Sequence, residues 1–208
     1  MLFGGTSSCD CAARYGHLVS AGDTPEATKW TIHEERYVDD AGRGRLTRAF
    51  VELPDGVRFE QYVLRLPAAA VVVVLDDEDR VLLIWRHRFI IDKWVWEMPG
   101  GYLDPEEDPL VAAAREVEEE TGWRARKIEP LLAFQPMLGA ADCENHLFLA
   151  RGADFTGAEL DVNEAERLTW MPLAEALDRM YAGEIPGAGS VVGLLATAAV
   201  RREEGWQP

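Results

Sequence analysis

Three glutamates within one short stretch offer the clearest chemistry in this sequence. Glu116, Glu119 and Glu120 stand at positions i, i+3 and i+4, so on a helix they share one face. Carboxylates crowded in this way repel one another at neutral pH unless a cation lies among them. Oxygen-only ligands favour a hard cation, Mg²⁺ or Mn²⁺, which also accepts water and phosphate oxygens. A metal site of this kind would suit attack of water on a diphosphate.

The flanking residues predict the helix that must present these glutamates. Asp108 can cap a helix start, and Pro109 fits the first helical position. Residues 110–120 contain no helix breaker, and Gly122 is a plausible stop. Three apolar residues are predicted to form a separate stripe that docks on a core: Leu110, Ala114 and Val117.

The whole stretch from Gly101 to Trp123 resembles the signature of the Nudix hydrolases, G-x5-E-x7-R-E-U-x-E-E-x-G-U, where U is apolar. The fixed positions are matched by Gly101, Glu107, Arg115, Glu116, Val117, Glu119, Glu120, Gly122 and Trp123. An E-x-x-E-E run alone is typical of a solvated acidic face. The glycine, glutamate and arginine at fixed offsets favour the catalytic interpretation. The resemblance implies metal-dependent cleavage of a diphosphate linked to another moiety.

The resemblance also implies roles for individual residues. The metal ligands it implies are Glu116, Glu119, Glu120 and the carbonyl of Gly100. Glu107, Arg115 and Gly122 would be structural, with Arg115 paired to Glu107 or Glu119. The proton acceptor stays open between Glu119 and two residues of a later loop. Those loop residues are Asp142 and Glu144.

Composition narrows the classes of function. The chain has 208 residues, 48% of them hydrophobic, and a formal net charge of −16. This charge argues against nonspecific binding to nucleic acid or to an anionic membrane. The longest apolar run, residues 68–75, is far shorter than the ~20 residues of a membrane span. Three cysteines and a first segment unlike a secretory signal indicate a reducing cytoplasm.

The chain divides into three predicted parts. Residues 1–26 lack periodicity and are predicted to be a mobile tail. Residues 27–66 are predicted to be a β segment, with a hairpin across Pro54-Asp55-Gly56. This segment is too small to fold alone, so it must pack on the main domain or on a second subunit. In the resembling subgroup such a segment pairs across subunits, which implies a homodimer. The main domain is expected over residues 67–208.

Strands before and after a central helix, with further helices late in the chain, predict an α/β fold with a mixed sheet. The resemblance implies an α/β/α sandwich preceded by the small β segment. The later elements are expected at 69–75, 81–86, 128–135, 146–151 and 168–171 for strands. Late helices are expected from Pro172, at its first position, to Tyr181, and at 190–202.

Residues outside the signature bear on the substrate. Residues 85–89, 96–101 and 134–139 resemble the subgroup that hydrolyses ADP-ribose and related nucleoside-diphosphate sugars. Arg86 and Arg88 alternate along a predicted strand and could clamp a diphosphate; Glu97 and Gly101 are further substrate-side candidates. The predicted reaction converts ADP-ribose to AMP and ribose 5-phosphate, with GDP-mannose or another sugar nucleotide as an alternative. A triphosphate-sanitising enzyme and a non-catalytic sugar-nucleotide sensor are the alternative functions.

Overall fold

The computed structural model describes residues 29–39, 42–157 and 166–207; the predicted tail, residues 1–26, lies outside these ranges. Within these ranges seven strands precede the first of three helices. In chain order they are β1 (Thr31–Asp39), β2 (Arg45–Glu52), β3 (Arg58–Arg65), β4 (Ala69–Leu75), β5 (Arg80–Arg88), β6 (Lys93–Glu97), β7 (Gly100–Tyr102), α1 (Pro109–Thr121), β8 (Trp123–Phe134), β9 (Ala141–Asp142), β10 (Asn145–Phe155), β11 (Arg167–Pro172), α2 (Leu173–Tyr181) and α3 (Ala188–Glu203).

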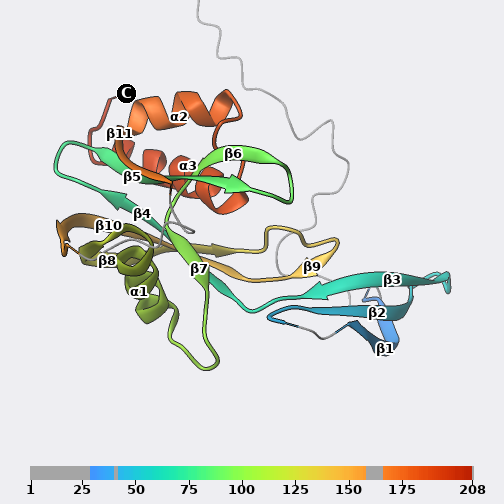
Figure 1. Ribbon diagram of the computed structural model, residues 1–208. Helices are drawn as coiled ribbons and strands as arrows, with labels where there is room; N and C mark the ends of the chain where they lie inside the picture. Colours follow the sequence, from blue (N-terminus) through green and yellow to red (C-terminus); the bar gives the residue numbers. More distant parts are fainter. Residues whose placement is uncertain (1–28, 40–41, 158–165, 208) are drawn as a thin grey trace, which may run out of the picture. The chain divides into compact units, whose positions relative to one another are not determined.

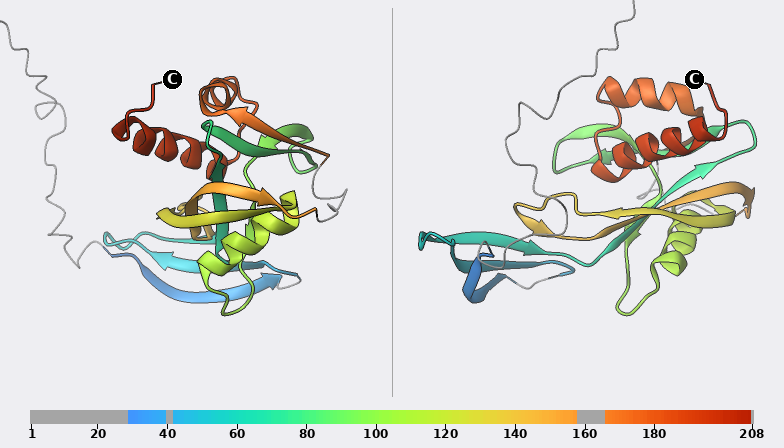
Figure 2. Two further views of the ribbon diagram at one scale, coloured as in Figure 1. Left: turned by 90° about the vertical axis from the view of Figure 1, so that its left-hand side faces the viewer. Right: turned by 180° about the vertical axis from the view of Figure 1, so that it is seen from behind.

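A seven-stranded sheet forms the centre of the larger part of the chain. Its strands run in the order β11-β5-β4-β10-β8, with β6 paired to β5 and β7 paired to β4. Strand β10 runs parallel to β4 and antiparallel to β8, so the sheet is mixed. Helix α1 lies on one face, and α2 and α3 lie on the other (Figures 1 and 2). The predicted α/β/α sandwich with a mixed sheet is confirmed.

Strand β4 organises both layers because its side chains alternate between the two faces. Ala70, Val72 and Val74 pack in the apolar cluster under α1. Val73 and Leu75 pack in the opposite cluster, with residues of α2 and α3. A strand buried on both faces is continuously apolar, which explains the A-A-V-V-V-V-L sequence of β4.

A second sheet has the strand order β1-β2-β3-β9. The described residues separate into two compact units, one with residues 29–36 and 48–61, the other with the described residues of 37–47 and those from 62 onward. Every residue of β1 is exposed, whereas β2 alternates between buried and less buried positions. The predicted hairpin is present between β2 and β3, but the boundary predicted at residue 67 stays a prediction.

The helix predicted around the glutamates is confirmed at both ends. The Asp108 side chain accepts a hydrogen bond from the Leu110 amide at 2.8 Å, and Pro109 opens the helix. Gly122 closes it in the left-handed conformation, with φ 68°. The predicted apolar stripe is wrong at two of its three positions, because Leu110 and Ala114 are exposed.

The buried face of α1 is made instead by Ala112, Ala113, Val117 and Glu120 together with Thr121. The two small alanines let the helix approach the sheet closely. Which face of α1 is buried therefore depends on the sheet as well as on the helix sequence. As a result Glu120 is turned inward, while Glu119 on the same helix remains exposed.

Other element boundaries differ for reasons visible in the sheet. Pro172 is not the first residue of α2 but its N-cap, because it is still paired with Arg80 in the β11–β5 ladder. Strand β8 begins at Trp123, five residues before the predicted start, since Trp123 pairs with Phe155 of β10. Strands β6, β7 and β9 were not predicted; they have five, three and two residues.

None of the helices within the described ranges combines the length and apolar character needed to cross a bilayer.

Removal of the α1 cap should weaken the fold measurably. We expect Asp108→Ala to lower the free energy of unfolding by about 1 kcal/mol, because the Leu110 amide loses its acceptor. Urea denaturation checks this value, with Asp77→Ala, in an exposed turn, as the control. Equal stability of the two variants would contradict the role of the cap.

Candidate active site

Glu120 is the most enclosed carboxylate on α1. Its side chain is 8% exposed. Oε1 accepts a hydrogen bond from Arg86 Nη2 at 2.7 Å, and Oε2 accepts one from the Gly100 amide at 2.8 Å. Burial raises the pKa of Glu120, an effect that Arg86 and the Gly100 amide oppose and that the charge of Glu116 reinforces. Two structural partners therefore support the ionised form of a buried acid.

Arg115 gathers the other carboxylates of the signature. It holds Glu107 with two hydrogen bonds of 2.9 Å each, from Nε and Nη2. Its Nη1 reaches Glu116 at 2.8 Å and Glu119 at 2.9 Å. The predicted pairing of Arg115 with carboxylates is confirmed, and it includes Glu107, Glu116 and Glu119 together. A single guanidinium thus offsets much of the repulsion among the acidic side chains.

The β5–β6 hairpin brings a second set of charges to α1. Arg86 and Arg88 stand two positions apart on β5, so their side chains share a face. Glu97 of β6 pairs with Ile84, which lies on the same face of β5, so all three charged side chains point to one side of the sheet. Arg88 holds Glu97 through Nε at 2.8 Å. His87 points to the other face, where it contacts Asp92 and Trp94. The predicted separation of the two arginines from His87 is confirmed.

Gly100 allows the strand that supports Glu120 to lie close to β4. A Cβ atom at this position would collide with the carbonyl oxygen of Ala70 and lie 2.8 Å from the Cα of Val71. Because both obstacles are backbone atoms, a larger residue would separate β7 from β4. The close approach of β7 sets the position of the Gly100 amide, which binds Glu120.

Two carboxylates of α1, Glu116 and Glu120, are of the ligand type that a hard divalent cation prefers. A Cβ at Gly101 would meet the Glu116 carboxylate at 2.5–2.6 Å, so glycine leaves the space beside that carboxylate open. Glu116 and Glu120 interact electrostatically across one helical turn, and two carboxylates with a carbonyl suffice for Mg²⁺, which also binds water and phosphate. Within the described ranges, no three His, Cys, Asp or Glu side chains are grouped to hold a metal. Arg115 and Arg86 bind the glutamates instead.

The later candidates for proton transfer, Asp142 at the end of β9 and Glu144 after it, are exposed. Asp142 forms an ion pair with Arg65 at 2.9 Å, and its side chain is 58% exposed. Glu144 lies 3.5 Å from His146 and is 54% exposed. Glu119 on α1 is similarly accessible, with 57% exposure. The geometry therefore leaves all three carboxylates available to solvent.

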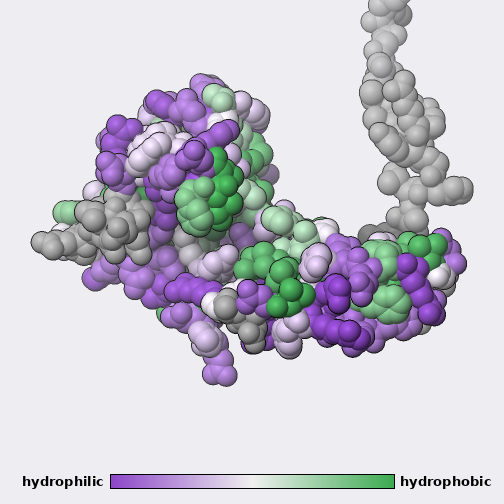
Figure 3. Space-filling view, turned by 45° about the vertical axis from the view of Figure 1, so that its right-hand side comes forward, coloured by the Kyte–Doolittle hydropathy of each residue, from purple (hydrophilic) through white to green (hydrophobic). Residues whose placement is uncertain are grey.

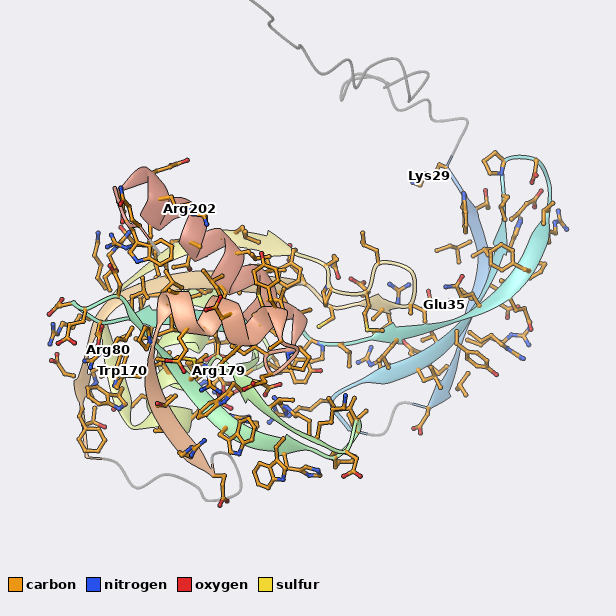
Figure 4. The ribbon with its side chains drawn as sticks, turned by 90° about the horizontal axis from the view of Figure 1, so that it is seen from above. Lys29, Glu35, Arg80, Trp170, Arg179 and Arg202 are labelled. Atoms are coloured by element: carbon orange, nitrogen blue, oxygen red, sulfur yellow. The ribbon has the colours of Figure 1, made fainter. Side chains whose placement is uncertain are left out.

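A separate hollow lies over β11 and α2. It has a volume of about 260 Å³ and includes Trp96, Arg167, Trp170 and Arg179 in its lining; Figure 4 labels Trp170 and Arg179. Arg179 already binds Glu175 at 2.9 Å and Glu184 at 2.8 Å. None of the predicted site residues lines this hollow.

Two contacts of the site could not be foreseen from the sequence. The Arg86–Glu120 pair joins residues 34 positions apart, and the Gly100 amide is a backbone group with no side-chain signal. The alternation of Arg86 and Arg88 was the available clue, because it placed both side chains on one face of a strand.

The NUDIX domain model matches residues 65–188 of the chain. A CMP-5'-(N-acetyl-N-hydroxy-3-aminopropyl)phosphonate hydrolase of Streptomyces rubellomurinus is 45% identical over 168 residues, which cover 81% of this chain and 82% of that protein. An ADP-ribose pyrophosphatase of Mycobacterium tuberculosis is 32% identical over 158 residues, which cover 74% of this chain and 76% of that protein. An ADP-ribose pyrophosphatase of Bacillus subtilis is also 32% identical, with 65% and 74% covered.

The fold has a counterpart among solved structures. The crystal structure of an ADP compounds hydrolase superposes with a TM-score of 0.75 at 21% identity, and the match covers 88% of this chain and 99% of that one. At this identity the likeness supports the fold.

The Arg115–Glu107 pair should make stability depend on pH in the acid range. Arg115 lowers the pKa of Glu107 from 4.5 to about 2. A depressed folded-state pKa gives stability that is present above pH 4.5 and is lost as the pH falls towards 2. We expect Glu107→Gln to flatten the pH dependence of the urea midpoint across this window. Glu106→Gln is the control, and an unchanged profile in Glu107→Gln would refute the assignment.

Proposed function

Since the chain belongs to the Nudix hydrolase family, we propose that it hydrolyses the phosphoanhydride bond of a nucleoside diphosphate linked to a small non-nucleotide group. ADP-ribose is the first candidate, with AMP and ribose 5-phosphate as products. One observation carries the proposal: α1 presents Glu116 and Glu120 beside the two glycines of β7, in a setting of oxygen donors that suits Mg²⁺ or Mn²⁺.

Glu116 and Glu120 would hold the cation, with Glu119 and the Gly100 carbonyl contributing. When bound, the cation supplies positive charge that neutralises the phosphate oxygens and favours ionisation of water. Arg115 restricts the side-chain rotation of Glu116 and Glu119 because it binds both carboxylates. Glu107 in turn fixes Arg115.

Arg88 is the proposed clamp for the diphosphate. Its side chain is 49% exposed, so it can reach a ligand, while Glu97 limits its orientation. A guanidinium presents paired N–H groups that match phosphate oxygens. Glu97 and the backbone at Gly101 then border the substrate from β6 and β7.

Proton transfer completes the reaction. Water forms a new bond to one phosphorus, the bridging P–O bond breaks, and a carboxylate accepts the proton of the water. Glu119 is our first choice for the acceptor, because it is exposed and lies on α1 with the metal-holding pair. Glu144 and Asp142 remain the alternatives.

The names of the relatives suggest a second substrate. Two relatives at 32% identity are ADP-ribose pyrophosphatases, whereas the one at 45% identity acts on a CMP-linked phosphonate. Both kinds of compound join a nucleoside 5'-phosphate to another phosphorus-bearing group. A CMP-alkylphosphonate is therefore the alternative substrate within the same proposed reaction.

A substrate panel with Mg²⁺ separates these possibilities. The panel contains ADP-ribose, a CMP-alkylphosphonate, GDP-mannose, UDP-glucose, dinucleoside polyphosphates and nucleoside triphosphates. We expect the highest kcat/KM for ADP-ribose, and a preference for the CMP compound would select the second candidate. Activity on triphosphates alone would indicate a sanitising enzyme. Binding without hydrolysis would indicate a sensor, and either result would overturn the proposal.

Loss of the buried metal-holding carboxylate should abolish turnover. We expect Glu120→Gln to lower kcat by more than about 100-fold, which exceeds the 10- to 100-fold usually lost with an outer-shell partner. The isosteric amide keeps the volume, so circular dichroism should show the native fold. Glu118→Gln is the matched control, because Glu118 also lies on α1 but binds Arg124. Full metal-dependent turnover by Glu120→Gln would refute the assigned site.

We further propose that the protein is a homodimer without nucleic-acid or membrane partners. Strand β1 supports the dimer, because its apolar side chains Ile32, Tyr37 and Val38 are 51–67% exposed. The preceding Trp30 is 52% exposed. Hydrophobic residues gather in separate patches on an otherwise hydrophilic face (Figure 3). Exposed apolar strands of this kind need a covering surface.

Light scattering at micromolar concentration measures the assembly directly. We expect about twice the chain mass of 23.2 kDa, because pairing would cover the exposed apolar side chains of β1. Ile32→Lys should shift the assembly towards the monomer, with Arg36→Lys on the same strand as the control. A monomeric wild-type protein would contradict the proposal.

Cytoplasmic location remains our expectation. Its support is the free, buried thiol of Cys143 in the described part of the chain, which is typical of proteins in reducing compartments.

A further inference from the structure

Arg86 occupies an unusual place among the charges of the site. It comes from β5, yet its Nη2 lies 2.7 Å from Oε1 of Glu120 on α1. Its side chain is only 13% exposed, compared with 49% for Arg88 two residues later. The two arginines thus share a strand face but differ in their access to a ligand.

A second nitrogen of Arg86 also lies inside the protein. Its Nε is buried and has no hydrogen-bond acceptor among the described residues. Oε2 of Glu97 lies 3.8 Å from this atom and is already bound by Arg88. Among the described residues, Glu120 is therefore the close ionic partner of Arg86.

The two partners of Glu120 approach different oxygens. Arg86 binds Oε1, and the Gly100 amide binds Oε2 at 2.8 Å. An ionised carboxylate offers about four lone-pair positions, so two remain for a further ligand after both bonds are made. With each oxygen fixed by one donor, the plane of the carboxylate and the direction of its remaining lone pairs are set.

We propose that Arg86 is a positioning residue that orients Glu120 for the divalent cation and does not clamp the substrate. The inference rests on the proposed function, because it takes Glu120 as a metal ligand. Partners behind a ligand commonly fix its orientation and so raise its affinity for the metal. Arg86 acts through Glu120, whereas Arg88 faces the phosphates.

Metal binding in the absence of substrate tests this role. Free Mn²⁺ is followed by electron paramagnetic resonance during titration of wild type, Arg86→Gln and Arg86→Lys. We expect Arg86→Gln to weaken Mn²⁺ binding about 10- to 100-fold, and Arg86→Lys to recover part of the loss by keeping the charge without the planar fork. Arg124→Gln is the matched control, since Arg124 also binds a glutamate of α1, Glu118, but is 69% exposed; its affinity should equal that of wild type.

Two results would overturn the inference. Equal Mn²⁺ affinity in Arg86→Gln would show that the contact has no positioning role. Tighter binding would show that Arg86 competes with the cation for Glu120. If Arg86→Gln fails to fold, as judged by circular dichroism, Arg86→Lys decides between these outcomes: weaker Mn²⁺ binding supports positioning, and unchanged or tighter binding refutes it.

Steady-state kinetics at saturating Mn²⁺ give a second readout. We expect Arg86→Lys to keep the wild-type KM for ADP-ribose, whereas Arg88→Lys should raise it. A raised KM in Arg86→Lys at saturating metal would identify a substrate clamp and contradict the inference. Failure of the wild-type protein to bind Mn²⁺ would instead contradict the proposed function, so the two failures are distinguishable.

Discussion

Repulsion among glutamates on one helix is the constraint around which this structure is arranged. Glu116, Glu119 and Glu120 lie within two turns of α1, and Glu120 is also buried. Arg115 offsets the charge at the outer side of the helix, where it binds Glu107, Glu116 and Glu119. Arg86 offsets it at the inner side. The arginines hold these carboxylates close together, and a divalent cation in the proposed site would offset the negative charge that remains.

The sheet supplies the inner half of this arrangement. Strand β4 joins both apolar layers through its alternating side chains. Strand β7 pairs with the first half of β4, and the two strands lie so close together that only glycine fits at position 100. The hairpin of β5 and β6 adds the two arginines and Glu97. Strands β5 and β7 therefore both reach Glu120 of α1, β5 through the Arg86 side chain and β7 through the backbone amide of Gly100.

Local signals predicted what depends on local structure. The cap at Asp108, the stop at Gly122 and the alternation on β5 all follow from neighbouring residues, and each is confirmed. Contacts that depend on the assembled sheet could not be predicted from the sequence. The inward turn of Glu120 and the exposure of Leu110 follow from how α1 packs on its neighbours. Strand β7 has three residues, two of them glycine, and offered no periodic pattern.

In the proposed reaction, Glu116 and Glu120 would hold a divalent cation against the diphosphate of the substrate. A crystal structure with Mn²⁺ and a non-hydrolysable methylene analogue of ADP-ribose tests it most directly. The account predicts a metal ion about 2.0–2.2 Å from a carboxylate oxygen of each glutamate and bound to a phosphate oxygen of the analogue. A metal ion coordinated elsewhere, with Glu120 still bound only to Arg86 and Gly100, would contradict it.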